Sequence, residues 1–511
     1  MPPGMNSQRC SFVWRPTVEA RTVQEYIDER PTWSDGTHLP TTPMTSMQWF
    51  IWSLAAAGKF FEGFVVFMTG VALPLISTEF GISHAQNGIV SAASLFGILI
   101  GAVALGGLSD YFGRKRMFII EMIIFCAFLA VLTGCSNFVL LVSCLFGLGL
   151  ALGCDYPTAH IIISESTPSL ARGKLVLGAF TFQAVGALAG TGVGYLVLSF
   201  APNLDAWRWM YGTALVPAII VTVGRFFITE SPNWLASRGD RSRAEEAAKK
   251  LLVRRPQYPK AMQLAERKRD NARPSFGALF NRRNRRATIL SSVPWFIQDL
   301  GTYGIGIFTP TILGAALGHS ADHIRSTSDL IANDILAAKG AALITSLLVV
   351  GILFAVMLSD RVGRIKLQVF GFIGCAAGLF VASLSTFTAG GSQIFLIFLG
   401  FMLFDFMTNL GPNAQTYLLA GEVFPTEIRG MGAGFAAAFA KIGAVATAFL
   451  FPILLAGIGT RSLLWGLVIT SLLGAVVTWQ YRIETTGVSL DRMGADPDEE
   501  MAKLPEEVAH A

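Results

Sequence analysis

Seven charged residues interrupt otherwise apolar stretches of this chain and are the first candidates for chemistry: Lys59, Glu62, Glu121, Asp155, Asp299, Asp405 and Lys441. A charged side chain inside a lipid bilayer costs several kcal/mol, so such residues usually mark a path for protons, ions or solutes. Burial favours the neutral, protonated form of a carboxyl group. A buried carboxyl can therefore bind and release a proton near neutral pH, and we predict this role for Asp155.

Simpler interpretations apply to some of these charges. Glu121 lies near one end of a predicted helix, so its side chain can reach the membrane surface. Lys59 and Glu62 are three residues apart and can neutralise one another on one helix face. Asp405, in LFDFMTN, can satisfy a polar group of a neighbouring helix.

Asp155 differs because of the residues around it. In GCDYP, Tyr156 follows it directly, and Pro157 distorts the helix and frees backbone polar groups beside a cavity. Asp155 also corresponds to Asn413 of GPNAQ at an offset of 258 residues. Matching polar positions in two related halves are where a solute site at the middle of a membrane is expected.

A second candidate region is PWFIQDLGTYGIG, residues 294–306. Trp295, Asp299 and Tyr303 are spaced by four residues, so they form one stripe of a helix. The stripe offers an aromatic wall, a protonatable carboxyl and a hydroxyl donor. Gln183 adds a further donor and acceptor, although a single glutamine can equally hold two helices together.

The elements that must position these residues are membrane helices. The chain is 52% hydrophobic and only 14% charged, whereas a soluble chain carries about a quarter charged residues. Apolar runs of roughly 20 residues, the length that crosses a bilayer, predict an all-α integral membrane protein with twelve helices near residues 48–77, 88–108, 117–134, 138–163, 174–200, 209–229, 288–317, 339–358, 366–388, 392–419, 431–456 and 461–483.

Charge distribution divides the chain and orients it. Sixteen Lys and Arg residues fall between Arg238 and Arg286, in a polar stretch between the sixth and seventh helices. Basic loops stay cytoplasmic, so we expect both termini to be cytoplasmic. Because the position of these charges follows this topology rule, we expect no nucleic-acid partner. The expected organisation is a flexible tail without a signal peptide, a first bundle, a basic loop, a second bundle and a second tail, at residues 1–47, 48–230, 231–287, 288–484 and 485–511.

Two motifs occur twice at nearly one offset, which indicates duplicated halves. LSDYFGRK (108–115) matches LSDRVGRI (358–365), and ESTPSLARG (165–173) matches EVFPTEIRG (422–430). The Arg of each motif can pair with nearby carboxylates, and the Glu and Arg of the second motif can pair with each other. We predict conformational gating by Asp110, Arg114, Glu165, Arg172, Asp360, Arg364, Glu422 and Arg429. The alternative is a set of solvated loops that only follow the charge rule.

These residues resemble the major facilitator superfamily. The doubled GGLSDYFGRKR-type loop, the doubled Glu-x-x-Pro-x-x-x-Arg-Gly and ESPNWLASRG (230–239) are similar to its sugar-porter-like branch, over about residues 48 to 487. The resemblance implies two pseudo-symmetric six-helix bundles around a central cavity, with transport by alternating access.

A narrower resemblance, to phosphate:proton symporters, comes from GCDYP, Gln183, WFIQDLGTY, GPNA and AKIGA (440–444). It implies phosphate contact by Tyr156, Gln183, Trp295, Asp299, Tyr303 and Asn413. It assigns Glu62 and Asp155 to proton coupling and Lys441 to the anion path. The chain departs from that family on the first helix, where the usual pair of aspartates three apart is missing and Glu62 is followed by Val65.

We therefore expect a proton-coupled secondary transporter of a small anionic solute, with inorganic phosphate as the first substrate to consider. An organic acid or another small metabolite is the main alternative. A sugar or polyol is less favoured, because Ile297–Gln298 and Asn413–Ala414–Gln415 replace the sugar-porter residues, and a non-transporting sensor is a remote alternative.

Other classes have no matching motif. The chain has no phosphate-binding loop for ATP and no nucleophile or metal-ligand constellation, and its six cysteines are scattered. We expect no enzyme activity, no cofactor and no metal, with solute, protons and the bilayer as partners. A monomer in a cell membrane is expected. The absence of Asn-x-Ser/Thr acceptors favours a bacterial inner membrane.

Overall fold

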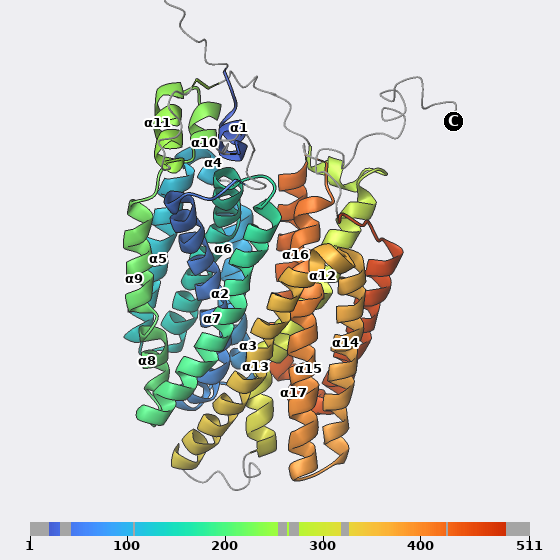
Figure 1. Ribbon diagram of the computed structural model, residues 1–511. Coiled ribbons are helices and arrows are strands. Elements are labelled where there is room, and N and C mark those ends of the chain that lie inside the picture. Colours follow the sequence, from blue (N-terminus) through green and yellow to red (C-terminus); the bar gives the residue numbers. More distant parts are fainter. Residues whose placement is uncertain are drawn as a thin grey trace, which may run out of the picture.

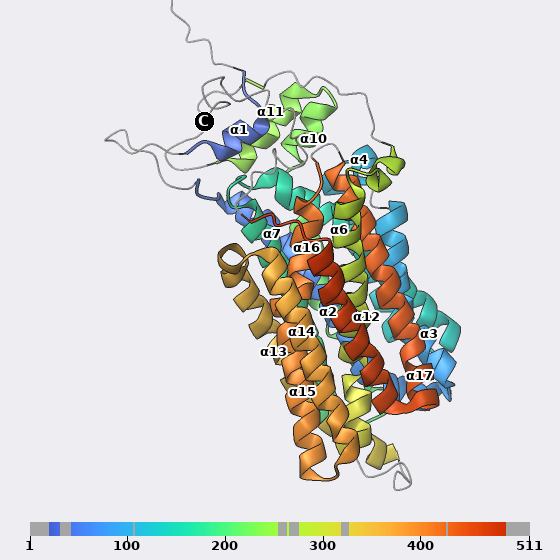
Figure 2. The same ribbon diagram turned by 90° about the vertical axis from the view of Figure 1, so that its right-hand side faces the viewer.

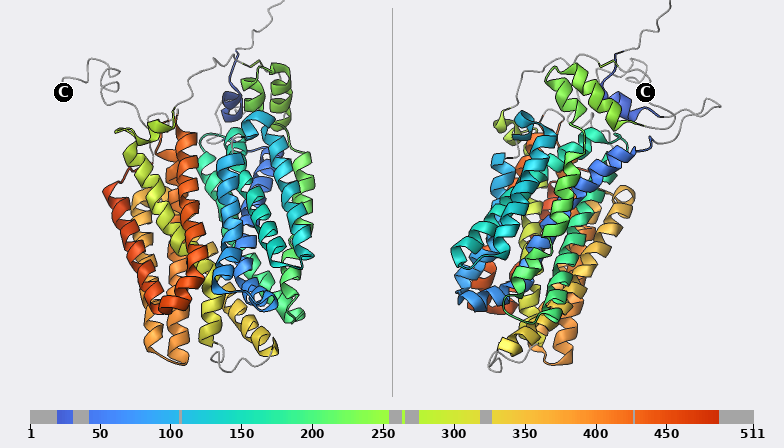
Figure 3. Two further views of the ribbon diagram at one scale, coloured as in Figure 1. Left: turned by 180° about the vertical axis from the view of Figure 1, so that it is seen from behind. Right: turned by 90° about the vertical axis from the view of Figure 1, so that its left-hand side faces the viewer.

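The helices of this chain form two halves that stand side by side (Figure 1). The computed structural model describes residues 20–30, 42–105, 108–253, 263–264, 275–317, 327–425 and 428–486. Seen from behind, the blue-to-green half and the yellow-to-red half keep this side-by-side arrangement (Figure 3).

The first half contains α2 to α9. Its helices are α2 (Ser46–Phe80), α3 (His84–Ile100) with a short π-helical continuation (Gly101–Leu105), α4 (Leu108–Phe112), α5 (Arg114–Thr133), α6 (Phe138–Ser166), α7 (Arg172–Phe200), α8 (Ala206–Gly212) and α9 (Leu215–Phe226). Short helices α1 (Val23–Asp28), α10 (Pro232–Ser237) and α11 (Arg241–Leu251) cover one end of this half (Figure 1). We call this end of the molecule the capped end.

The second half contains α12 to α17. Its helices are α12 (Arg285–Leu317), α13 (Thr327–Val362), α14 (Arg364–Leu384), α15 (Gly391–Leu410), α16 (Pro412–Glu422) and α17 (Arg429–Gln480), with 3-10 turns at Phe276–Phe280 and Ser385–Phe387. The halves meet where α3 lies against α17 and α7 against α13. The first of these contacts is visible in Figure 2.

The predicted twelve-helix membrane fold is confirmed. Ten helices of the described residues are long and apolar enough to span a bilayer. The longest, α17, is two spans, because Gly459 has φ 75° and ψ 166° and interrupts the helix. The remaining span is α12, which is 33 residues long and contains Pro294 and Pro310.

Two local expectations need correction. The predicted tenth span, 392–419, is broken into α15 and α16 at Gly411, whose φ of −108° and ψ of −100° are not helical. The N-terminal segment is not flexible throughout, because residues 20–30 contain α1, which starts with a Thr22–Glu25 capping box. The Asp28 carboxylate of α1 accepts hydrogen bonds from the backbone amide and hydroxyl of Ser169.

Close backbone contact joins the halves away from the capped end. A Cβ atom placed on Gly70 of α2 would lie 2.1 Å from the carbonyl oxygen of Ile307 on α12. No side chain fits in that space, so glycine is needed for α2 and α12 to approach this closely.

Candidate functional site

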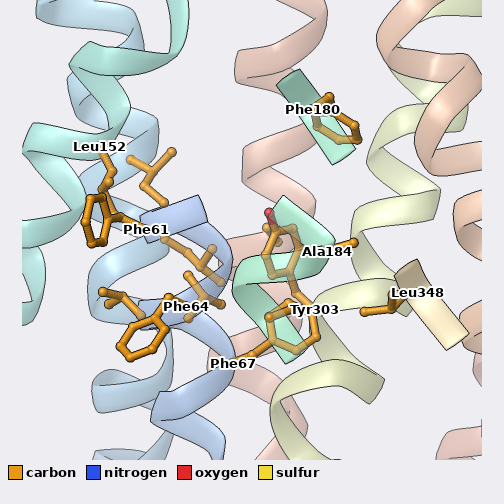
Figure 4. Close-up of a cluster of buried hydrophobic side chains, with 14 of the residues drawn as sticks. Phe61, Phe64, Phe67, Leu152, Phe180, Ala184, Tyr303 and Leu348 are labelled. Carbon is orange, nitrogen blue, oxygen red and sulfur yellow. The ribbon is translucent and has the colours of Figure 1, made fainter. Parts of the chain in front are cut away.

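A cavity between the two halves is the centre of the candidate site. Its empty volume is about 310 Å³, and it is lined from six helices by Phe67, Gln183, Ala184, Ala187, Gln298, Thr302, Tyr303, Leu348, Asn409 and Asn413. Figure 4 shows Phe67, Ala184 and Tyr303 close together, with Leu348 extending toward them from α13. The lining side chains are amides, hydroxyls and apolar groups, which suit a small uncharged or singly charged solute.

A cluster of buried charges lies directly behind Tyr303. The Lys441 ammonium donates to the Tyr303 hydroxyl at 2.6 Å, and lies 3.3 Å from Glu62 Oε1 and 3.6 Å from Asp299 Oδ2. Lys59 lies 3.0 Å from Glu62 Oε2. The four charged side chains are each at most 5% exposed. We call Lys59, Glu62, Asp299 and Lys441 the central cluster.

Tyr303 connects this cluster with the cavity. Its hydroxyl accepts from Gln183 Nε2 at 3.2 Å as well as from Lys441, and donates to Glu62 Oε1 at 3.4 Å. The sequence-based alternative, in which Lys59 and Glu62 simply neutralise each other, is therefore incomplete. Glu62 is shared between Lys59 of its own helix and Lys441 of the other half.

The structure brings some predicted contact residues to the cavity and leaves others beside it. Gln183, Tyr303 and Asn413 line the cavity, and Asn413 donates to Asn409 at 2.6 Å. Asp299 and Lys441 lie in the central cluster and Trp295 packs elsewhere; none of these three is among the lining residues. The side chain of Tyr156 lies outside the described part of the chain.

Four aromatic rings lie together one turn from the cavity, toward the capped end. Phe180 of α7 stacks on Tyr417 of α16 with ring centroids 4.4 Å apart. His160 and Trp295 contact the same tyrosine ring edge-on at 6.1 and 6.0 Å. Because these rings come from both halves, they join the halves on the capped-end side of the cavity.

Asp155 lies inside the first half and is paired with an arginine that the sequence analysis did not consider. Arg225 of α9 is completely buried and contacts Asp155 of α6 at 2.7 Å and Glu121 of α5 at 2.9 Å. The expectation that Glu121 reaches the membrane surface is wrong, because its side chain is 1% exposed. The sequence signal for this buried Arg225 was a single arginine in the apolar run TVGRFF.

Gly58 leaves room for the Asp155 carboxylate. A Cβ atom on Gly58 would lie 1.9 Å from Asp155 Oδ2, so the carboxylate packs directly against the backbone of α2. Lys59, the next residue on α2, interacts electrostatically with the same carboxylate.

The duplicated loop motifs form two matching networks at the capped end. In the first half, Arg114 lies 3.4 Å from Glu165, and the Ser231 hydroxyl donates to the same carboxylate. In the second half, Arg364 lies 3.2 Å from Glu422, and the Thr485 hydroxyl donates to that carboxylate.

Two further carboxylates complete these networks, and the sequence analysis did not identify them as site residues. Glu230 accepts from the amide of Lys115, and Glu484 accepts from the amides of Arg364 and Ile365. Both belong to a Glu-Ser or Glu-Thr pair, 230–231 and 484–485, repeated at an offset of 254 residues. Burial disfavours the Glu484 carboxylate, but hydrogen bonds from Thr486 and the two amides outweigh it and hold its pKa below the ordinary range.

Within each Glu-x-x-Pro-x-x-x-Arg-Gly motif the glutamate also contacts an arginine of the other motif, and Arg172 interacts electrostatically with Glu165 as expected. Arg172 points to the Ser169 hydroxyl at 3.5 Å, and Arg429 donates to the Phe424 carbonyl oxygen. Glu165 and Glu422 contact Arg114 and Arg364 of the other motif, which approach them from the neighbouring helix. Asp360 lies 2.8 Å from Arg364 and 3.5 Å from Lys174 of the opposite half. The side chain of Asp110 lies outside the described residues.

Twelve membrane helices in two related halves, with a polar cavity between them, define a multi-pass membrane transporter. The family model described as "Sugar (and other) transporter" matches residues 51–496. The chain belongs to this family of the major facilitator superfamily, as the sequence resemblance predicted, and its relatives are transporters rather than enzymes.

Individual relatives carry different substrate names. The chain is 28% identical to the "Putative metabolite transport protein YaaU" of Escherichia coli, covering 85% of this chain and 92% of the relative. It is 29% identical to the "Probable inorganic phosphate transporter 1-12" of rice, covering 82% and 84%. The proton:xylose symporter XylE of E. coli shares the fold with a TM-score of 0.69 at 21% identity, covering 88% of this chain and 99% of XylE.

Proposed function

We propose that this chain is a proton-coupled transporter of a small anion, with inorganic phosphate as the first substrate to test. The observation that carries the proposal is the central cluster, in which two lysines and two carboxylates from both halves meet behind the cavity. The name of the rice relative gives phosphate its priority among anions.

The charge of this cluster depends on one proton. With all four groups ionised, Lys59 and Lys441 balance Glu62 and Asp299, and the cluster is neutral. Asp299 Oδ2 has no hydrogen-bond partner among the described residues and lies 3.6 Å from Lys441, so Asp299 is the less strongly held carboxylate. A proton on Asp299 leaves one net positive charge beside the cavity, which attracts a monoanion. Loss of that proton restores neutrality and weakens anion binding.

The neighbouring polar groups supply the contacts for the solute. Gln183, Tyr303 and Asn413 offer amide and hydroxyl donors to the oxygens of an anion in the cavity. Tyr303 transmits the charge of Lys441 through their hydrogen bond. In this proposal Tyr156 and Trp295 also contact phosphate, and Glu62 and Asp155 assist proton coupling.

Alternating access follows from the contacts between the halves. The Gly70 contact with Ile307 joins the halves on the side of the cavity away from the cap, and the stack of Phe180 on Tyr417 joins them on the side toward the cap. Transport requires each to open in turn, with the Arg114 and Arg364 networks keeping each half rigid. We place the capped end in the cytoplasm, in a bacterial inner membrane, with the monomer as the working unit.

A neutral polyhydroxyl solute is the second candidate. The side chains that line the cavity carry no charge, and amides with hydroxyls are the groups that bind sugar hydroxyls. The cavity has room for a small solute only, in either case.

Uptake into proteoliposomes with an imposed pH gradient separates these candidates. We expect labelled phosphate to accumulate when the proton gradient points inward, and we expect Asp299→Asn to abolish this accumulation. Asp334→Asn is the matched control, since Asp334 is a buried carboxyl of α13 outside the cluster. Accumulation of a hexose or polyol without any uptake of phosphate or small carboxylates would show that the anion assignment is wrong.

A further inference from the structure

The buried charges of the two sites form one continuous row. Glu121 contacts Arg225 at 2.9 Å, Arg225 contacts Asp155 at 2.7 Å, and Asp155 interacts with Lys59 across Gly58. Lys59 contacts Glu62 at 3.0 Å, which contacts Lys441 at 3.3 Å, and Lys441 reaches Asp299 at 3.6 Å. The row passes from α5 through α9, α6, α2 and α17 to α12.

The signs of the seven charges alternate along this row. Four carboxylates and three cations give a net charge of −1 when all are ionised, and each side chain is at most 5% exposed. An unbalanced charge in a dry interior is costly, and a carboxyl group relieves it by taking up a proton. One proton is therefore enough to neutralise the whole row.

The ends of the row are where that proton is held. Each interior group has an opposite charge on both sides, whereas Glu121 and Asp299 each face a single cation. The structure marks the same two residues independently, because Glu121 Oε2 and Asp299 Oδ2 are the carboxylate oxygens of the row that are buried without a hydrogen-bond partner among the residues that the structure describes.

Within the described part of the chain, the surroundings of each end add no other cation in direct contact. Glu121 faces Arg225 from α9, Asp155 and the Cys154 thiol from α6, and the apolar ring of Phe118 over which Arg225 lies. Asp299 faces Lys441 from α17 and Glu62 from α2.

We infer that Glu121 is a second proton-binding site, remote from the solute cavity, that shares one proton with Asp299 through this row. The inference rests on the proposed proton coupling and extends it. A proton at Glu121 leaves Asp299 ionised and the central cluster neutral, whereas a proton at Asp299 prepares the cluster for an anion. Proton exchange deep in the first half thus controls the charge of the cavity.

Infrared difference spectroscopy of the purified protein in lipid, without any solute, tests this. The carboxyl band that Asp299→Asn removes reports protonation of Asp299 as the pH is varied. Glu121→Gln removes one negative charge from the row, so we expect the Asp299 titration to move to lower pH by roughly half to one unit. Asp334→Asn, a buried carboxyl outside the row, leaves the titration in place.

The reciprocal measurement protects against a Glu121 variant that fails to fold. Linkage is mutual, so Asp299→Asn shifts the titration of the Glu121 band to lower pH by the same amount. An unshifted titration in both variants, or no protonated Glu121 band at any pH, overturns the inference. Solute transport plays no part in this experiment, so a wrong substrate assignment leaves its outcome unchanged.

Discussion

Replacing Arg225 with methionine tests the buried pairing in the first half. Its guanidinium is fully buried, contacts Glu121 and Asp155, donates to the carbonyl oxygen of Phe118 at 2.5 Å and lies 3.4 Å over the Phe118 ring. Methionine has a similar length and fits an apolar space, so Arg225→Met removes the charge with little change in volume.

The expected loss is large because Glu121 loses the cation that it contacts, and Asp155 loses its contact at 2.7 Å and keeps only the interaction with Lys59. Removing one partner of a buried ion pair costs about 3–5 kcal/mol, mainly from the charge that is left behind. A proton on Glu121 relieves part of this cost, so we expect the free energy of unfolding to fall by about 3–5 kcal/mol rather than by twice that amount. The triple variant Arg225→Met, Glu121→Gln, Asp155→Asn leaves no charge behind and regains most of the loss.

Denaturant unfolding of the purified protein in detergent measures both values. Arg461→Met is the control, since Arg461 is exposed at the end away from the cap and its removal costs only a cation–π contact with Phe387, worth about 0.5–1 kcal/mol. If Arg225→Met is as stable as the parent protein, or if the triple variant is less stable than the single one, the pairing described here does not support the fold.

Two further predictions concern the closed end and the capped end. Gly70→Val places a side chain against Ile307. Overpacking of about 1–3 kcal/mol lowers the population of the closed form by roughly 5- to 150-fold, so we expect solute uptake to fall by a similar factor. Gly457→Val, with open space around it, is the control and transports normally. Because the pKa of Glu484 is held below its ordinary range, its contribution to stability is fully present above the ordinary carboxyl pKa of about 4.3 and is lost as the pH falls through the lowered value. Glu484→Gln therefore lowers stability at neutral pH and reduces the loss of stability on acidification, and equal acid sensitivity of the variant and the parent in unfolding experiments would contradict this.

Much of the fold could be predicted from the sequence because it depends on local properties. Apolar runs of span length and the duplicated motifs around Arg114 and Arg364 determine the number of helices and the two halves. The break at Gly459 falls between the predicted spans 431–456 and 461–483. The break at Gly411 was not predicted, because it lies within a continuous apolar run whose composition does not reveal a change in backbone angles.

The candidate site was predicted only in part. Residue type and spacing brought Gln183, Tyr303 and Asn413 forward, and the structure places these side chains at one cavity. The partners of Asp155 could not be predicted, because which helix presents a cation to it depends on tertiary packing. For the same reason Glu121 and Arg225 were misjudged or overlooked, although each was visible as a charge in an apolar run.

The central claim is that binding of an anion is accompanied by binding of a proton at Asp299. Phosphate added to the purified protein in weakly buffered solution measures this directly through the change in pH. We predict proton uptake on phosphate binding by the parent protein and by Asp334→Asn, and none by Asp299→Asn. Phosphate binding without any proton uptake by the parent protein and by Glu121→Gln, in which no proton can move from Glu121 to Asp299, would contradict the account.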